Sequence, residues 1–238
     1  MRVEFKPQDL MIVIPTLGRS LLRQTLRSFL DTAPTGVLAV VVFDGIPPLD
    51  LVELQALQVI FIENKKRLGY WGSLNAGLEA LERPLVGFYA DDVLFHPYWL
   101  ESALNCYNGY FKDGKGLLAV HDGVWKNFHA SHGFISRKWL WILYGEPKFP
   151  ECYKHDFGDS ELTQFSKDFQ RFKYCNACEI EHLHYDNKRR EWDEIDDVGA
   201  SSKYEDGTLY PIRYDEWVRV GKREAEQRMI KDYREGLK

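Results

Sequence analysis

The chain has 238 residues and a formal net charge of −5, with 31 Lys and Arg against 36 Asp and Glu. This length suits one large domain or a domain with a small appendage, and the charge excludes a protein-wide positive field that would attract a polyanion. The longest apolar runs, such as Leu10–Pro15 and Val37–Phe43, are far shorter than the roughly 20 residues that span a bilayer. The four cysteines are too few for a secreted disulfide scaffold, and the N-terminus lacks the apolar core of a signal peptide. We therefore expect a reduced, cytoplasmic protein without a transmembrane segment.

The first half of the chain alternates short apolar runs with stretches of helical spacing. The predicted strands are Leu10–Thr16, Val37–Asp44, Val59–Glu63 and Leu85–Ala90. The predicted helices that follow them are Ser20–Leu30, Leu49–Leu57, Tyr70–Leu81 and Pro97–Tyr110. Strands that are apolar throughout and are each followed by a helix indicate a parallel sheet covered on both faces.

After Lys115 this regular alternation ends. Predicted strands are Leu117–His121, Gly133–Ser136 and Tyr174–His184, and predicted helices are Arg137–Leu143, Asp159–Phe169 and the charged Tyr214–Arg234. The last helix has few apolar residues, so we expect it to pack on the outside of the domain or against a partner.

Polar residues follow every strand of the first half. They are Thr16 and Arg19 after the first strand, Asp44 after the second, Asn64 and Arg67 after the third, and Asp91 and Asp92 after the fourth. Ligands of parallel α/β sheets bind at the carboxyl ends of the strands. The sequence therefore predicts a binding site rich in carboxylates at this edge.

Seven segments in chain order match motifs of one enzyme family. They are Met11–Arg19 (MIVIPTLGR), Val41–Gly45 (VVFDG), Asn64–Leu78, Phe88–Pro97 (FYADDVLFHP), Gly133–Trp139 (GFISRKW), Gly158–Leu162 (GDSEL) and Tyr174–His182. Together they resemble the family-2-like glycosyltransferases of GT-A fold, which move a sugar from a nucleotide-sugar to an acceptor. Two positions depart from the family pattern, because Tyr89 replaces the first acid of D-x-D-D and Gly158 replaces the Glu of E-D.

The resemblance implies an α/β fold of GT-A (Rossmann-like) type, with a mostly parallel sheet covered by helices and a C-terminal helical extension. Residues 1–115 would form the nucleotide-sugar-binding half, 116–185 the acceptor and catalytic half of the same domain, and 186–238 the extension. The implied reaction is a metal-dependent transfer of a hexosyl group to a hydroxyl acceptor. We expect inversion of the anomeric centre because Asp159 is a single candidate base, and a retaining mechanism stays open. The residues expected to bind the nucleotide-sugar are Pro15, Thr16, Arg19, Asp44, Arg67, Gly69, Asn75 and Asp91.

The pair Asp91–Asp92 is the sharpest chemical feature of the sequence. Adjacent carboxylates repel each other, and a divalent cation bound between them and a diphosphate relieves that repulsion. Mn²⁺ or Mg²⁺ would also stabilise the charge that develops on the departing nucleoside diphosphate. Neighbouring side chains of a strand face opposite ways, so one of the pair ligates the metal. The resemblance assigns that role to Asp92.

Histidines near the end of the last predicted strand offer a further metal ligand. His182 and His184 lie on one side of the strand because they are two residues apart. The resemblance implies His182 as a metal ligand, with His184 as a second possibility. Cys175 and Cys178 form a C-x-x-C, but structural zinc is disfavoured because no second such pair exists in the sequence.

Asp159 opens a predicted helix, where the helix dipole favours its ionised form. An ionised carboxylate can remove the proton of an acceptor hydroxyl, and the resemblance implies this base role for Asp159. Glu161, two residues later, is the alternative base.

Other functions remain open from the sequence alone. A catalytically silent nucleotide-sugar-binding protein fits the loss of two motif acids, and a nucleotidyltransferase could use a related sheet. The acceptor class is open, with saccharide, lipid-linked, protein and nucleic-acid acceptors all compatible. The basic cluster Lys188–Arg190 could contact a polyanion, but the acids that follow it favour a solvated loop of mixed charge.

Overall fold

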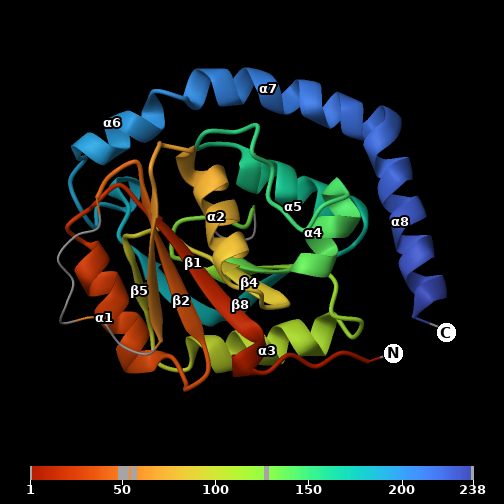
Figure 1. The fold of residues 1–238 in the computed structure, drawn as a ribbon, viewed down its shortest axis with the longest axis horizontal. Helices are drawn as coiled ribbons and strands as arrows, with labels where there is room; N and C mark the ends of the chain where they lie inside the picture. The colour runs from red at the N-terminus through yellow and green to blue at the C-terminus, as the bar shows by residue number, and fades with distance from the viewer. Residues whose placement is uncertain (1, 48–53, 55–57, 126–128, 237–238) are drawn as a thin grey trace.

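The computed structural model describes residues 2–47, 54, 58–125 and 129–236. Its strands are β1 (Leu10–Thr16), β2 (Leu38–Asp44), β3 (Val59–Asn64), β4 (Leu85–Phe88), β5 (Val93–Phe95), β6 (Leu117–His121), β7 (Gly133–Ser136) and β8 (Phe172–His182). They form one eight-stranded sheet in the order β3-β2-β1-β4-β7-β6-β8-β5 (Figure 1). In this part of the chain four strand pairs are parallel and three are antiparallel. The expected α/β class with a mostly parallel sheet is confirmed.

Helices cover both faces of the sheet. The described helices are α1 (Leu22–Thr32), α2 (Gly69–Ala80), α3 (Trp99–Tyr110), α4 (Arg137–Tyr144), α5 (Gly158–Asp168), α6 (Glu194–Ala200), α7 (Lys203–Glu216) and α8 (Lys222–Glu235). A five-residue π-helical turn, Trp217–Gly221, joins α7 to α8. Among the described residues, none of the helices has the length and apolar composition that crossing a membrane requires.

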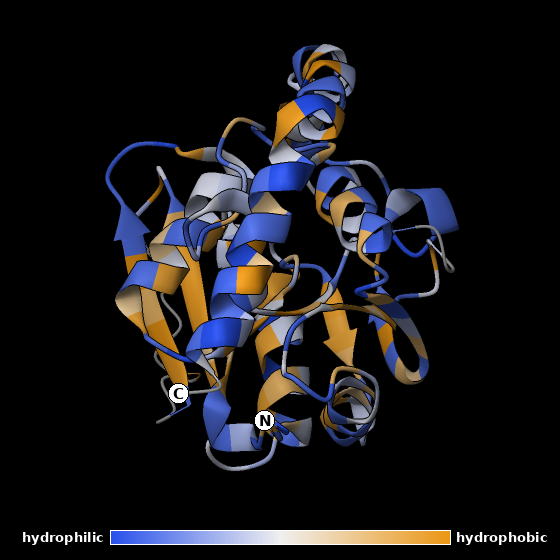
Figure 2. Ribbon diagram, turned by 90° about the vertical axis from the view of Figure 1, so that its right-hand side faces the viewer, coloured by the Kyte–Doolittle hydropathy of each residue, from blue (hydrophilic) through white to orange (hydrophobic). Residues whose placement is uncertain are grey.

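Every residue of β1 is buried because each face of this strand meets a different part of the core. Ile12 and Ile14 pack in the cluster that includes Phe29 of α1, whereas Met11 and Val13 pack in the cluster of α2, α4 and α5. Alternating side chains explain why a strand in the middle of a parallel sheet is apolar throughout. In Figure 2 the strands are accordingly mostly orange.

The C-terminal extension contains more helix than the sequence indicated. We expected one helix at 214–234, but helical residues extend from α6 through α8, and the last two helices arch over one side of the domain (Figure 1). The ring of Trp217 stacks on Phe165 of α5 at 3.9 Å between centroids. The Arg228 guanidinium donates to the backbone oxygens of Ile142 and Leu143 at the end of α4. These few anchors dock helices that are otherwise polar, which is why hydrophobic periodicity underestimates their extent.

The helix expected at 49–57 lies outside the described residues, apart from Leu54, and stays a prediction. One other detail differs from expectation. Strand β5 was not expected, because it has only three residues and is defined by its antiparallel pairing with the end of β8. Pairing between residues almost 90 positions apart leaves no local pattern in the sequence.

Candidate active site

A cavity of about 210 Å³ lies at the carboxyl ends of β1, β2 and β4, where parallel α/β sheets bind ligands. Its walls include eleven of the thirteen residues that were expected from the sequence to bind the donor, ligate the metal or act as the base. These are Pro15, Thr16, Arg19, Asp44, Arg67, Gly69, Asp91, Asp92, Asp159, His182 and His184. The cavity therefore brings together residues that are up to 169 positions apart.

Asp44 organises the loop that leads into α2. Its Oδ1 accepts hydrogen bonds from the Leu68 amide at 2.8 Å and from Asn64 Nδ2 at 3.0 Å, and its Oδ2 accepts one from the Gly69 amide at 2.9 Å. Gly69 has a φ of 79°, and a Cβ there would lie 2.5 Å from the Lys154 backbone oxygen. A glycine is required here for both reasons.

Asp91 and Asp92 lie in the turn between β4 and β5, rather than in a strand, and their carboxylates have different principal partners. Asp91 Oδ2 accepts a hydrogen bond from Thr16 Oγ1 at 2.6 Å, and its Oδ1 lies 3.3 Å from Arg19 Nε. Asp92 Oδ1 lies 3.2 Å from His182 Nε2. Burial and the neighbouring Asp92 charge raise the pKa of Asp91 to about 6. Burial also acts to raise the pKa of Asp92, but His182, Arg19 and Arg190 outweigh it and hold this pKa below its usual value.

The residues expected to hold a divalent cation fit that role. Asp92 Oδ1 is buried and has no hydrogen-bond donor within the described part of the chain, and it faces His182 Nε2. A carboxylate oxygen and an imidazole nitrogen are both ligands of Mn²⁺. His184 also lines the cavity, and burial together with the charge of His182 lowers its pKa to about 4. The cysteines Cys175 and Cys178 are buried and free.

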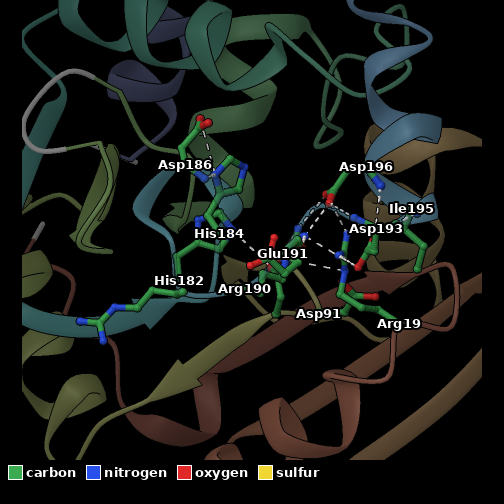
Figure 3. Close-up of polar contacts among 12 residues, drawn as sticks. Arg19, Asp91, His182, His184, Asp186, Arg190, Glu191, Asp193, Ile195 and Asp196 are labelled. Atoms are coloured by element: carbon green, nitrogen blue, oxygen red, sulfur yellow. Dashed lines mark hydrogen bonds and ion pairs between the residues drawn. The ribbon is translucent and has the colours of Figure 1, made fainter.

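Arg190, which belongs to the C-terminal extension, contacts the Asp92 carboxylate. Its Nη2 lies 3.2 Å from Asp92 Oδ2 and 2.7 Å from Asp196 Oδ1, while Arg19 contacts Asp193 and Asp196 (Figure 3). The side chain of Arg190 is only 10% exposed. The expectation that this stretch is a solvated loop is therefore wrong for Arg190. In the sequence, Arg190 is followed by acidic residues three and six positions later. That spacing is the sequence signal for the ion-pair network that the structure forms.

Asp159 lies in the first turn of α5 and lines the cavity. Its Oδ1 accepts a hydrogen bond from the Ser160 amide at 2.7 Å, and its Oδ2 lies 3.1 Å from His129 Nε2. Burial acts to raise its pKa, but the hydrogen bond and charge of His129 prevail and lower it. The pKa of His129 is correspondingly raised by Asp159 against the effect of burial. The sequence did not indicate His129, which is 30 positions away.

Two expected site residues are not part of the cavity wall. Glu161 is fully buried, where it accepts hydrogen bonds from Tyr153 Oη at 2.8 Å and from Arg213 Nε at 2.6 Å. The Asn75 amide pairs with both the backbone nitrogen and the backbone oxygen of Phe149. Glu161 thus joins α5 to α7, and Asn75 joins α2 to the segment before α5.

Comparisons with known proteins identify the family and the fold of this chain. The family model of glycosyl transferase family 2 matches residues 11–157. Among solved structures, S. aureus TarS aligns with a TM-score of 0.58 at 15% identity, covering 72% of this chain and 36% of that one. The mannosyltransferase PcManGT from Pyrobaculum calidifontis, in complex with GDP-Man and Mn²⁺, aligns with a TM-score of 0.57 at 16% identity, covering 74% and 57%. A TarS 1–349 structure in complex with UDP-GlcNAc aligns with a TM-score of 0.56 at 15% identity, covering 72% and 57%.

This chain spans between about a third and three fifths of the length of these solved relatives. No curated protein matches the sequence. The family model covers more than half of the chain and includes the residues that end β1, β2 and β4. The chain belongs to glycosyl transferase family 2, as its sequence motifs indicated.

Proposed function

We propose that the protein is a metal-dependent glycosyltransferase that moves a hexosyl group from a nucleotide-sugar to a hydroxyl acceptor with inversion. The observation that carries the proposal is one cavity that holds both a metal-ligand pair, Asp92 and His182, and an ionised base, Asp159. Family membership supports the reaction class. The bound GDP-Man and UDP-GlcNAc of the solved relatives support a nucleotide-sugar as donor.

Residues 1–115 would bind the donor. Asp44 and the loop that it fixes would orient the nucleotide, and Arg19 lies where it can reach a diphosphate as well as Asp91. Asp92 and His182 would hold Mn²⁺ or Mg²⁺, which compensates the charge of the departing nucleoside diphosphate. Arg190 places a second positive charge on the same side of the cavity.

Residues 116–185 would supply the base, and residues 186–238 would close the cavity with Arg190. Asp159 Oδ would accept the proton of the acceptor hydroxyl while that oxygen attacks the anomeric carbon. A single carboxylate base acting opposite the leaving group gives inversion of the anomeric centre. The contact with His129 keeps the base oriented, with Asp159 Oδ2 3.1 Å from His129 Nε2.

The test is a calorimetric and thermal-shift comparison of UDP- and GDP-sugars with and without Mn²⁺, followed by a transfer assay on simple saccharide acceptors. We expect stabilisation by a nucleotide-sugar only with the metal, and its loss in Asp92→Asn. Asp9→Asn, at the surface before β1, is the matched control. Binding without turnover in any donor and acceptor pair would favour a silent nucleotide-sugar-binding protein. Release of pyrophosphate from a nucleoside triphosphate and a sugar phosphate would indicate a nucleotidyltransferase.

A further inference from the structure

A cluster of buried metal-ligand side chains extends from the donor cavity into the sheet. Asp122 follows β6, His132 precedes β7 and His182 ends β8. One ligand atom of each residue lies within 4.8 Å of the other two. All three residues are buried, with exposures of 3%, 3% and 7%. These separations allow a single ion to contact all three residues after small side-chain movements, because ligand bonds of transition ions are about 2.0–2.2 Å long.

Several polar atoms of this cluster have no hydrogen-bond partner among the residues that the structure describes. They are His132 Nδ1, His182 Nδ1 and the adjoining Asp92 Oδ1. His132 Nδ1 faces Asp122 Oδ2 at 3.5 Å without forming a hydrogen bond. Buried polar atoms are nearly always paired, and each unpaired one costs about 1–3 kcal/mol. The unpaired nitrogens of His132 and His182, both members of the cluster, indicate a ligand that the two imidazoles share.

Surrounding contacts hold the cluster in place. Asp122 Oδ1 accepts hydrogen bonds from the Val124 and Trp125 amides at 2.9 and 3.0 Å, and Asp122 Oδ2 accepts one from Ser131 Oγ at 2.5 Å. The rings of His132 and His182 meet edge to face, with centroids 4.5 Å apart. The carboxylate is thus fixed before any ion binds, as in protein metal sites whose ligands are oriented by outer hydrogen bonds.

Tyr89, which stands where the family pattern D-x-D-D has its first acid, packs against this cluster. Its ring stacks on His132 at 5.7 Å between centroids, with 15° between the planes. The position of Tyr89 is the one at which the pattern has its first acid, so this chain has lost a carboxylate there. The side chain that replaces it holds His132 in the cluster. Where the family pattern has an acid, this chain therefore has a ring that packs on His132, and His132 and Asp122 lie between β6 and β7.

We propose that Asp122, His132 and His182 form a cation site that opens onto Asp92. Two imidazoles and a carboxylate make this site selective for a first-row transition ion such as Mn²⁺ or Zn²⁺ over Mg²⁺, because Mg²⁺ prefers oxygen ligands and retains its water. A site built from Asp92 and His182 alone has a weaker preference of this kind. The role of the ion in sugar transfer rests on the function proposed above, but its binding does not require a donor.

The test uses the full chain with Mn²⁺ alone. Pulsed EPR counts the imidazole nitrogens coupled to bound Mn²⁺, and calorimetry compares the affinities for Mn²⁺, Zn²⁺ and Mg²⁺. We expect two coupled nitrogens and the weakest binding for Mg²⁺. In His132→Gln we expect one nitrogen and at least about a 10-fold loss of Mn²⁺ affinity. His121→Gln is the matched control, because His121 ends β6 and pairs with Tyr174 Oη instead.

One coupled nitrogen in the wild type, equal affinity for Mg²⁺ and Mn²⁺, or no metal binding would each overturn the inference. The nitrogen count on the wild type decides even if His132→Gln fails to fold. A nucleotide-sugar titration on the same samples separates this result from the function. If two histidine nitrogens couple to bound Mn²⁺ but no nucleotide-sugar binds, the proposed function is refuted and this inference stands. If a nucleotide-sugar binds only with the metal but a single histidine nitrogen is coupled, this inference is refuted and the proposed function stands.

Discussion

Arg190 Nη2 lies 3.2 Å from Asp92 Oδ2, although the two residues are 98 positions apart in the sequence. The contact brings a charged side chain of the C-terminal extension to the carboxylate that is expected to ligate the metal. The other oxygen of Asp92, Oδ1, is directed toward His182. Asp92 therefore lies between a fixed positive charge and a metal-ligand side chain.

The contact between Arg190 and Asp92 predicts that Arg190→Gln has a higher affinity for the metal. A neighbouring positive charge opposes a second cation at the same carboxylate, so the variant should bind Mn²⁺ roughly 3–10-fold more tightly in the absence of donor. Isothermal calorimetry measures the change. Arg189→Gln is the control, because Arg189 is 60% exposed and pairs with Glu181 instead. Unchanged affinity in Arg190→Gln would show that the guanidinium does not influence the metal site.

Asp159→Asn should separate chemistry from donor binding. The amide retains the size of the carboxylate but cannot accept the hydroxyl proton, so transfer should fall by about 10²–10⁴-fold. Donor affinity should change by less than a few-fold, as measured by calorimetry on the same preparation. Near wild-type transfer would place the base elsewhere. Asp197→Asn, which removes a surface carboxylate paired with Trp192, is the control.

His129→Gln should move the acidic limb of the pH profile to higher pH. In the wild type, His129 lowers the pKa of Asp159 against the effect of burial, so the base is ionised even in mildly acidic solution. Without that charge, burial raises the pKa, and activity should fall most at low pH and least above about pH 8. A kcat/KM profile checks this, with the surface variant His96→Gln as control. A uniform loss at every pH would instead indicate a purely structural role.

The same ion pair makes stability depend on pH in a defined direction. The pKa of Asp159 is lowered in the fold, so its contribution is present above the ordinary pKa of an aspartate and is lost as the pH falls through the lowered value. The pKa of His129 is raised, so its contribution is present below the ordinary pKa of a histidine and is lost as the pH rises through the raised value. Urea unfolding of the wild type should therefore show stability lost as the pH rises through the raised pKa of His129, and His129→Gln should lack that loss.

Glu161→Gln should affect stability more than catalysis. Its carboxylate is buried and contacts Tyr153 and Arg213, so the substitution weakens the link between α5 and α7. Because the Arg213 side chain is 27% exposed, the expected loss of unfolding free energy is discounted to about 1–3 kcal/mol. Urea unfolding measures it. Arg219→Gln breaks an exposed pair with Asp215 and should cost less than about 1 kcal/mol.

The sequence alone was enough to predict the α/β class, the family and four of the five strands that the structure describes before residue 115. Buried parallel strands are apolar throughout, and residues such as Asp44 and Asp91 follow them directly in the chain, so both signals are local. The position of Asp92 beside His182 could be expected from the family pattern, and the structure places them 3.2 Å apart.

Tertiary structure decided which of these residues share the cavity. Glu161 and Asp159 are two positions apart in the first turn of α5, yet one is buried against Arg213 and the other lines the cavity. Arg190 and His129 join the site through contacts over 98 and 30 positions. The sequence determined which side chains can ionise or ligate a metal, because that depends on residue type. Only folding decided which of them meet, because those contacts are made by segments that no local pattern connects.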